Sequence, residues 1–341
     1  MISHQARRFS IFVFTFLLLL GCQIPGITMP IIIPGTATLT STITITPTRT
    51  ATATATETST STITPTPTPL ARRVLILSID GLRPDAISLA PMPNLLALMQ
   101  NSAYSLSAQT VYPSVTLISH SSMLTGLCPS KHGVTWNDYI PEKGYALGTD
   151  LFDIAHAAGM NTVMYVGKEK LRQVTEPSST DTFVFINDRD LVITERLIAD
   201  FLQDFRLLFV HFPTPDWMGH DYGWLSSQQL SVIYRADEAL GQILAELSVR
   251  GLREETLIII TADHGGHDTT HGSSLPEDMT IPWIASGPGI QPKQLTTLVH
   301  TMDTAATAAF VLGLTIPAEW DGVPVTEAFG LPIERQSAVC Q

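Results

Sequence analysis

The 341-residue chain has little cysteine, little basic charge and no apolar run long enough to cross a bilayer. Its three cysteines, Cys22, Cys128 and Cys340, do not predict a disulfide framework, although one bridge in an exported domain stays open. With 19 Lys and Arg against 31 Asp and Glu, the net charge of −12 argues against non-specific nucleic-acid binding, which relies on a basic surface. The net charge does not exclude an anionic substrate, because bound metal ions would dominate the electrostatic field at their site.

The longest apolar run occupies residues 11–20, after Arg7 and Arg8. A basic segment followed by a run of this length is typical of a secretory signal and is too short for a transmembrane helix. The run ends in LLLLGC, which is similar to a bacterial lipobox with Cys22 as the lipid-modified residue. We therefore expect residues 1–22 to be a lipoprotein signal and the protein to be anchored on the outer face of the cytoplasmic membrane. An ordinary signal peptide and a short uncleaved anchor are the alternatives.

Residues 23–70 have the composition of a tether. Threonine occupies every even position from 36 to 68, and proline recurs near the end of the segment. Proline cannot donate the hydrogen bonds of a β-ladder, so the period of two does not predict a strand. Low-complexity Thr/Pro tracts form extended, in some proteins O-glycosylated, stalks. The remaining chain predicts one large domain at residues 71–335 and a short tail at 336–341.

Strand and helix patterns alternate along this domain. Continuous apolar runs such as RVLILSI, LLFVHF and TLIIIT predict buried parallel strands, whereas longer amphipathic segments predict helices. This alternation predicts an α/β protein, a three-layer α/β/α sandwich around a mostly parallel sheet. The expected strands are 73–79, 104–111, 162–166, 182–186, 207–212, 256–261 and 282–285, and the expected helices are 93–101, 151–158, 191–205, 226–250, 301–314 and one that begins near 116.

Three acidic residues follow three of the expected strands. Asp80 follows the first, Asp216 follows LLFVHF and Asp263 follows TLIIIT, so all three are expected at the carboxyl edge of the sheet, where such folds bind ligands. Histidines accompany them in the same segments. The combined set suffices for two divalent metals, with zinc favoured and manganese or iron as alternatives. The six residues are Asp80, Asp216, His220, Asp263, His264 and His271.

Thr116 is the candidate nucleophile. It follows a Pro-Ser turn and begins a helical pattern, so it is expected at a helix N-terminus that favours an anion. The competing interpretation is a simple helix cap. A threonine hydroxyl needs metal coordination to act as a nucleophile, so the fold must bring Thr116 next to Asp80.

An ordered set of motifs resembles the alkaline phosphatase superfamily, and most closely its nucleotide pyrophosphatase/phosphodiesterase branch. The motifs are SIDG (78–81), VT-x-x-x-H (115–120), TGLCPSKHG (125–133), PD-x-x-GH (215–220) and ADHGGH (262–267). The resemblance implies an alkaline phosphatase-like fold over most of the domain. It also implies hydrolysis of phosphodiester or phosphoanhydride bonds in a small phosphorylated substrate.

The resemblance further implies how the residues share the work. Thr116 would attack phosphorus to form a phosphothreonine that water then hydrolyses, and Asn137 would bind a phosphoryl oxygen. One metal would be held by residues from the segments at 215–220 and 271, the other by residues from the remaining segments. The two implied sets are Asp216, His220 and His271 for the first metal, and Asp80, Asp263, His264 and Thr116 for the second.

The chain also leaves alternatives open. It lacks the Cys-x-Pro-x-Arg pattern of sulfatases, which disfavours that activity, and His267 competes with His271 as a ligand. The segment VGKEKLR is similar to one in phosphonoacetate hydrolases, where paired lysines hold the substrate carboxylate. Lys168 and Lys170 are therefore candidate substrate ligands, although such a cluster is often only a solvated face. A phosphomonoesterase or a C–P bond hydrolase is thus the alternative activity, and a non-catalytic binding module is a third.

Overall fold

The computed structural model describes residues 68–201, 203–333 and 335–340. The expected signal at 1–22, the lipobox Cys22 and the tether up to residue 67 lie outside the described residues. Within the described residues, no helix is both long and apolar enough to cross a membrane.

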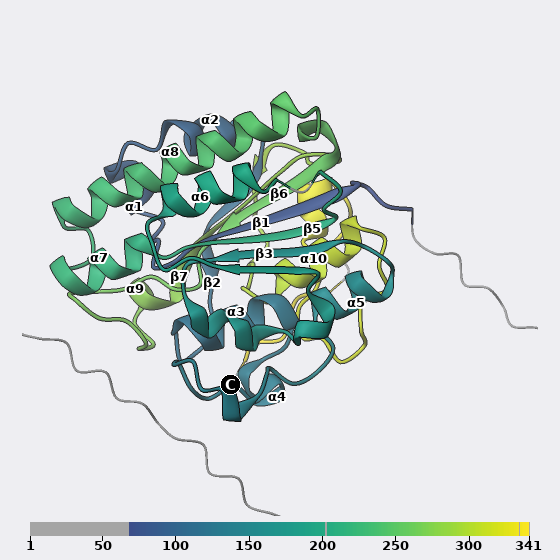
Figure 1. Cartoon of the computed structure of the whole chain (residues 1–341), viewed down its shortest axis with the longest axis horizontal. Coiled ribbons are helices and arrows are strands. Elements are labelled where there is room, and N and C mark those ends of the chain that lie inside the picture. Colours follow the sequence, from purple (N-terminus) through teal and green to yellow (C-terminus); the bar gives the residue numbers. More distant parts are fainter. Residues whose placement is uncertain (1–67, 202, 334, 341) are drawn as a thin grey trace, which may run out of the picture. The chain divides into compact units, whose positions relative to one another are not determined.

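An eight-stranded sheet forms the centre of the domain, in the order β4-β3-β5-β1-β6-β7-β2-β8 (Figure 1). The strands from β4 to β6 in that order run parallel, and β7 is antiparallel to both of its neighbours. The expectation of a mostly parallel sheet is confirmed. The strands are β1 (Arg73–Ile79), β2 (Ala103–Gln109), β3 (Thr162–Val166), β4 (Thr182–Phe185), β5 (Leu207–Phe212), β6 (Thr256–Thr261), β7 (Thr280–Ser286) and β8 (Lys293–Gln294).

The central strands are buried over their whole lengths, because helices cover both faces of the sheet. All residues of β1, β5 and β6 are buried, and in register Val74 of β1 pairs with Leu207 of β5 and Leu257 of β6. Such continuous burial explains why these strands are apolar without alternation. Asp80 directly follows β1, so the sheet fixes its position.

Two layers of helices enclose the sheet (Figure 1). Helices α1, α2, α6, α7 and α8 lie on one side, and α3, α4, α5 and α10 on the other. The longest, α8, begins at the cap Ser226 and buries residues spaced three or four apart, as expected for an amphipathic helix. The helices are α1 (Ala86–Leu89), α2 (Pro93–Met99), α3 (Thr116–Thr125), α4 (Pro129–His132), α5 (Leu151–Ala157), α6 (Asp190–Ala199), α7 (Thr214–Tyr222), α8 (Ser227–Val249), α9 (Pro276–Met279) and α10 (Asp303–Val311). The 3₁₀ helices are η1 (Pro141–Lys143), η2 (Glu169–Val174), η3 (Pro177–Ser179), η4 (Arg253–Glu255) and η5 (Thr326–Phe329).

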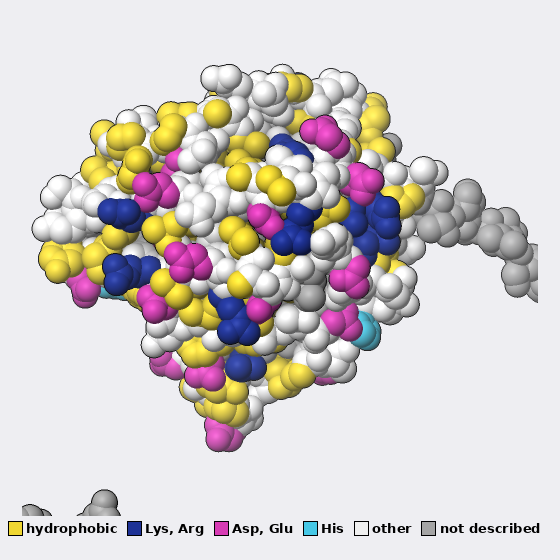
Figure 2. Space-filling view, turned by 45° about the horizontal axis from the view of Figure 1, so that its top comes forward, with side chains coloured by type: hydrophobic (Ala, Val, Ile, Leu, Met, Phe, Trp, Pro, Cys, Tyr) yellow, Lys and Arg dark blue, Asp and Glu magenta, His cyan; other side chains and the backbone are white. Residues whose placement is uncertain are grey.

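The surface of the domain carries charges of both signs. On the face shown in Figure 2, acidic and basic side chains are interspersed among apolar and uncharged polar ones.

The structure differs from the expected elements at several ends. The helix expected at 191–205 ends at Ala199, and the segment PDWMGHDY, for which the sequence analysis named no element, belongs to α7. The strand expected at 282–285 starts earlier, at Thr280, and the two-residue β8 carries no sequence signal.

A disulfide joins Cys128, just before α4, to Cys340 near the C-terminus. The Cα atoms lie 5.4 Å apart, and 212 positions separate the two residues in sequence. The bridge left open by the sequence is therefore present. It attaches the C-terminal segment, which also contacts the domain where Ser337 meets His300 and Asp303.

Candidate dimetal centre

Two groups of potential metal ligands lie at the carboxyl edge of the sheet. Within each group the ligand atoms are all within 4.8 Å of one another. The residues come from the ends of β1 and β6, from α7 and from the loop after β6. The first group is Asp216, His220 and His271, and the second is Asp80, Asp263 and His264.

Asp216 and His220 share one face of α7. They are four residues apart in the helix, a spacing that places side chains side by side. Nε2 of His220 lies 3.4 Å from Oδ1 of Asp216, and Nε2 of His271 lies 3.5 Å from the same oxygen. One turn of helix thus supplies two members of the first group.

The three histidines are oriented alike by the backbone. Nδ1 of His220 faces the carbonyl of Thr269 at 3.0 Å, and Nδ1 of His271 faces that of Ser114 at 2.8 Å. Nδ1 of His264 is 2.8 Å from the carbonyl of Gly265. A carbonyl only accepts, so each Nδ1 carries the proton and each Nε2 presents a lone pair to its group. This is the arrangement that metal-ligating histidines commonly show.

Four of the candidate ligand atoms lack a hydrogen-bond partner among the described residues. Oδ1 of Asp80, Oδ1 of Asp216, Oδ2 of Asp263 and Nε2 of His264 are buried and form no hydrogen bond within the described part of the chain. Buried polar atoms are normally satisfied, so a cluster of such atoms needs an explanation. Two divalent cations would provide it, because the mixed Asp/His set without thiolate suits such ions.

Burial and mutual repulsion change the pKa values of the ligands. Burial, together with the nearby Asp80 carboxylate, raises the pKa of Asp263 to about 7. Burial and the stacked ring of His264 lower the pKa of His271 to about 3, so its imidazole stays neutral, the form that binds metals.

Close approach of the backbone at Gly81 joins the two groups. Its N–H donates to Oδ1 of Asp263 at 3.2 Å, while its carbonyl accepts from Nε1 of Trp224 at 2.9 Å. The residue has φ +73°, and an added Cβ would lie 3.2 Å from Cα of Asp216. Only glycine meets both conditions without strain.

Thr116 begins α3 beside both groups and is 1% exposed. Its Oγ1 lies 3.1 Å from Nζ of Lys168. Its carbonyl faces Nδ1 of the buried His120 at 2.7 Å, and Nε2 of His120 meets Oγ of Ser78 at 2.8 Å. His120 therefore supports the first turn of α3.

Lys168 links the two ligand groups. Its Nζ lies 2.6 Å from Oδ2 of Asp80 and 2.6 Å from Oδ2 of Asp216. Burial alone would lower the pKa of Lys168, but the two carboxylates raise it overall, so the ammonium stays charged. The lysine occupies the Oδ2 atoms, whereas the unpartnered Oδ1 atoms face the histidines. The structure thus places Lys168, a candidate substrate ligand from the sequence, between the two ligand groups.

Asn137 and Lys170 flank the same edge. Oδ1 of Asn137 accepts from the backbone N–H of Leu117 at 2.9 Å, which fixes the carboxamide next to Thr116. Burial and the neighbouring Lys168 lower the pKa of Lys170, whereas Asp80 and Asp216 oppose that effect. Lys170 is thus electrostatically coupled to the centre without an ion pair to its ligands within the described residues.

His211 is a residue that the sequence analysis missed. It is fully buried in β5, and its Nε2 lies 2.9 Å from Oδ2 of Asp80. The N–H of Gly167 points to Nδ1 of His211 at 3.3 Å, so Nδ1 accepts and Nε2 donates to the carboxylate. A histidine inside the otherwise apolar run LLFVHF was the available signal.

His267 and His271, the two competing ligands, have different surroundings. Nδ1 of His267 pairs with Oδ1 of Asp278 at 2.7 Å, whereas His271 is a member of the first ligand group. Trp224 packs edge-on against His220 and His271 with ring centroids 5.3 and 5.8 Å away, and it is buried, so it supports the ligands.

The fold and this site define an α/β protein of the alkaline phosphatase type. Solved structures show the same fold: a variant of the alkaline phosphatase PafA has a TM-score of 0.67 at 12% identity, covering 76% of this chain and 99% of that one. Murine ectonucleotide pyrophosphatase/phosphodiesterase 5 has a TM-score of 0.62 at 18% identity, covering 72% and 96%. The expected fold class is confirmed.

The type I phosphodiesterase / nucleotide pyrophosphatase family matches residues 74–298, and the chain belongs to it. An uncharacterised pyrophosphatase/phosphodiesterase of Schizosaccharomyces pombe is 25% identical over 214 residues, 56% of this chain and 44% of that protein. Ectonucleotide pyrophosphatase/phosphodiesterase family member 3 of Mus musculus is 27% identical over 220 residues, 58% and 25% of the two chains. The chain therefore spans less than half the length of these relatives.

Proposed function

We propose that the protein is a metal-dependent phosphodiesterase or nucleotide pyrophosphatase that acts through Thr116 and two divalent cations, most suitably zinc. The observation that carries the proposal is the position of the Thr116 hydroxyl at a helix N-terminus, close to two groups of ligand residues with unpartnered atoms. Membership of the phosphodiesterase family supports the reaction class.

The proposed reaction is a double displacement. Oγ1 of Thr116 loses its proton to solvent and forms a bond to phosphorus, while the bond from phosphorus to the leaving oxygen breaks. Water then attacks the phosphorus atom of the phosphothreonine and loses a proton. The bond from phosphorus to Oγ1 breaks, and Oγ1 takes up a proton, so the hydroxyl of Thr116 is restored. The cations would supply charge neutralisation for the phosphoryl group and for the attacking and leaving oxygens.

Residues of the chain orient and stabilise the phosphoryl group in this scheme. The free N–H groups at the start of α3 favour an anion there. The carboxamide of Asn137 would donate to a phosphoryl oxygen, because its own oxygen is held by Leu117.

Replacement of the nucleophile tests the proposal. Thr116→Ala is expected to abolish hydrolysis of bis-p-nitrophenyl phosphate, while the metal content measured by mass spectrometry stays near two equivalents. Thr116→Ser, which keeps a hydroxyl, serves as the matched control and should retain activity. Full activity of Thr116→Ala would refute the mechanism. If both variants lose their metal, their inactivity reflects the missing metal ions and not the missing nucleophile.

A phosphomonoesterase or phosphonate hydrolase is the second candidate. The charged Lys168 beside Thr116 favours this activity, because an ammonium next to the phosphoryl group suits a dianion better than a monoanionic diester. The measurement is a comparison of kcat/KM for bis-p-nitrophenyl phosphate, p-nitrophenyl phosphate, p-nitrophenyl thymidine monophosphate and phosphonoacetate. A preference for the monoester or phosphonoacetate would replace the diesterase assignment.

Export and lipid anchoring through Cys22 complete the proposal. The lipobox-like LLLLGC and the Thr/Pro-rich residues 23–70 support it, and the disulfide fits an oxidising compartment. Metabolic labelling with a palmitate analogue in a bacterial host tests it. Cys22→Ser should lose the label and leave the membrane fraction, whereas a label retained in that variant would contradict the anchor.

A further inference from the structure

A buried carboxyl outside the candidate dimetal centre holds the helix that carries two of its ligands. Asp190, the first residue of α6, is 2% exposed. Its Oδ1 accepts from the backbone N–H of Thr214 at 3.1 Å and from Oγ1 of Thr214 at 2.7 Å. In return, Oγ1 of Thr214 accepts from the N–H of Asp190 at 3.3 Å. These hydrogen bonds join the start of α6 to the start of α7.

Helix α7 has no side-chain cap of its own. The residue before it is Pro213, and no side chain forms a capping hydrogen bond at that position. The first N–H groups of a helix have no partner within the helix, so a buried helix start needs an acceptor from elsewhere. Thr214 is buried, and Asp190 supplies this acceptor from a different helix. Asp216 and His220 follow in the same helix, so the contact at Thr214 fixes the element that positions both ligands.

A cavity beside this junction makes the hydrogen bonds more important. It has a volume of about 440 Å³ and is lined by Asp190 and Thr214, together with residues of α6 and α8 such as Leu191 and Val232. Because side chains of the described residues do not fill this space, close packing does not hold the start of α7 on that side. The polar contact between Asp190 and Thr214 therefore supplies the rigidity there.

The position of α7 also sets the distance between Lys168 and Asp216. Pro213, directly before α7, lies so close to Gly167 that a Cβ added to Gly167 would be 2.2 Å from Cγ of Pro213. Glycine permits this close approach of the two backbones. Gly167 in turn precedes Lys168, whose Nζ lies 2.6 Å from Oδ2 of Asp216. The start of α7 and the lysine segment are thus in direct contact beside the centre.

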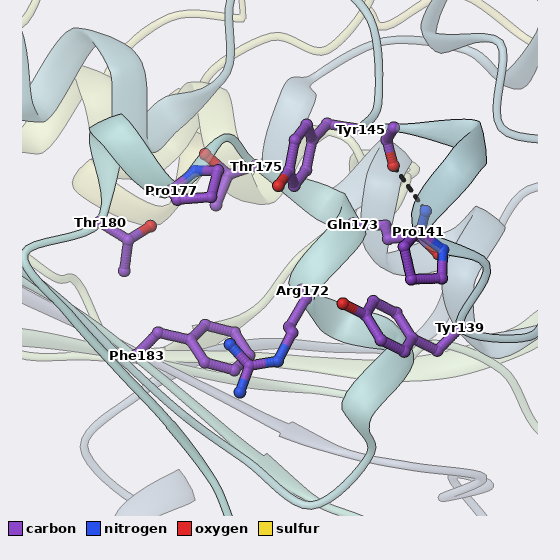
Figure 3. A pocket seen from close by; sticks show the side chains of 10 residues that line it. Tyr139, Pro141, Tyr145, Arg172, Gln173, Thr175, Pro177, Thr180 and Phe183 are labelled. Carbon is purple, nitrogen blue, oxygen red and sulfur yellow. Dashed lines mark hydrogen bonds between the residues drawn. The ribbon is translucent and has the colours of Figure 1, made fainter. Parts of the chain in front are cut away.

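The segment after Lys168 is fastened separately. Figure 3 shows Gln173 of η2, whose Nε2 donates to the carbonyl of Gly144 at 2.6 Å. The same amide donates to the carbonyl of Ile140 and accepts from its N–H. These partners lie on the loop around η1 and not on α7. A shift of α7 would therefore change the geometry between Lys168 and Asp216, because the two segments would not move together.

We propose that Asp190 is a positioning residue of the dimetal centre, which fixes the start of α7 through Thr214 and thereby the places of Asp216 and His220. The inference rests on the proposed function, in which these two residues bind a metal ion. Oδ2 of Asp190 has no hydrogen-bond partner among the described residues, so its contact with Thr214 runs through Oδ1. Burial raises the pKa of Asp190 to about 7, so the neutral carboxyl is well populated at neutral pH and an acceptor oxygen matters more than a full charge.

Titration of the metal-free full chain with cobalt(II) tests the proposal, because the visible absorption of bound cobalt reports the affinity and ligand geometry of each site. His220→Ala, which removes a ligand of the first group, identifies the absorption of that group. Asp190→Ala should weaken cobalt binding at the first group about 10-fold or more and spare the second. With zinc in excess, its kcat for bis-p-nitrophenyl phosphate should fall about 10- to 100-fold while KM changes little, because misplaced groups cost rate. Asp190→Asn keeps the acceptor oxygen and should restore most of the affinity and of kcat.

Asp237→Ala is the matched control. Asp237 is a fully buried residue of α8 whose carboxyl accepts from the N–H groups of Asn94 and Leu95 at 3.0 and 2.8 Å, at the start of α2. Its loss should lower the melting temperature, as the loss of Asp190 does, yet leave cobalt binding and kcat unchanged. Thr214→Val removes only the hydroxyl and should change both measurements in the same direction as Asp190→Ala. This milder variant decides the question if Asp190→Ala does not fold.

The outcomes separate the two proposals. If the unmodified protein binds no cobalt and hydrolyses no diester, the proposed function fails and the positioning role fails with it. If the protein is active but Asp190→Ala and Thr214→Val only lose stability, as Asp237→Ala does, the positioning role alone is refuted. Equal weakening of both ligand groups would also refute it, because α7 contributes ligands to the first group only. If Asp190→Asn is as defective as Asp190→Ala, the charge of the carboxyl is responsible and the positioning role is overturned.

Discussion

Nζ of Lys168 lies 3.1 Å from Oγ1 of Thr116 and also contacts one carboxylate from each group of candidate metal ligands. The lysine thus connects the proposed nucleophile to both halves of the site. An ammonium at this position should raise kcat/KM more for a substrate whose phosphoryl group carries more negative charge.

Lys168→Met is therefore expected to lower kcat/KM for p-nitrophenyl phosphate by about 100-fold or more, and for bis-p-nitrophenyl phosphate by no more than about 10-fold. The methyl thioether keeps the volume but removes the ammonium. Lys131→Met, on the exposed side of α4, controls for the loss of a lysine. Equal losses on both substrates would mean that Lys168 supports the ligands and does not discriminate between substrates.

His211→Leu should weaken metal binding at the group that contains Asp80 by about 10- to 100-fold, because the carboxylate loses the donor that orients it. His211→Gln can place an N–H near the same oxygen and should restore part of the affinity. The measurement is metal content after dialysis against graded chelator. Retention of both equivalents by the leucine variant would show that Lys168 alone fixes Asp80.

Removal of the metals should abolish hydrolysis reversibly. Treatment with EDTA is expected to stop turnover of bis-p-nitrophenyl phosphate, and added zinc should restore it. The reason is that, among the described residues, Lys168 is the only cationic side chain that contacts the buried carboxylates of both ligand groups, so metal ions must supply the remaining positive charge. Unchanged rates after thorough chelation would exclude the proposed chemistry.

Glu327 should control stability in acid. Burial alone would raise its pKa, but hydrogen bonds from Lys293, Thr296 and Thr297 lower it to about 2 from the ordinary 4.5. A depressed carboxyl pKa stabilises the fold above about pH 4.5, and the contribution is lost as the pH falls from there toward 2. Glu327→Gln should therefore lower the free energy of unfolding at pH 7 by roughly 1–3 kcal/mol.

Urea unfolding followed by tryptophan fluorescence measures this effect. The difference between Glu327→Gln and the unmodified protein should narrow between pH 4.5 and pH 2. Glu142→Gln, at an exposed position in η1, is the control for the loss of a glutamate carboxylate. If the difference in free energy of unfolding between the two proteins is the same at all pH values, the lost stability comes from packing and not from the charge of Glu327.

Loss of the bridge between Cys128 and Cys340 should destabilise the domain by an amount on the order of 3–5 kcal/mol, because the bridge closes a long loop in the unfolded chain. The Cys128→Ser, Cys340→Ser double variant should melt at a lower temperature. Reductant should lower the melting temperature of the unmodified protein and leave that of the double variant unchanged.

The sequence predicted the parts of the fold and site that depend on local pattern. The strands β1, β5 and β6 are continuous apolar runs, and Asp80 and Asp263 closely follow two of them. Because parallel strands end at a common edge, their convergence could be expected before the structure was known.

The remaining features depend on tertiary contacts. Lys168 lies in a charged segment whose sequence is typical of a solvent-exposed surface. Only the fold, in which this segment follows β3, places its ammonium between two carboxylates. His211 sits in an apolar run, and only its pairing with Asp80 reveals its role. The helix α7 contains proline and glycine, and its short amphipathic pattern was too weak to predict a helix. The disulfide joins residues 212 positions apart, a pairing that no local pattern encodes.

Backbone carbonyls, and not side chains, orient the imidazoles of His220, His264 and His271. Every amino acid has a carbonyl, so Thr269 and Ser114 can change without disturbing the histidine tautomers. Gly265 is the exception, because an added Cβ would lie 2.0 Å from the carbonyl oxygen of Glu277. Substitutions can thus accumulate around the centre as long as the loops keep their path. For engineering, the loops at 265–272 and 112–115 should keep their lengths. The ligand His271 should also be kept, as should Gly265 and Gly266, where an added Cβ would lie 2.0 and 2.2 Å from neighbouring atoms.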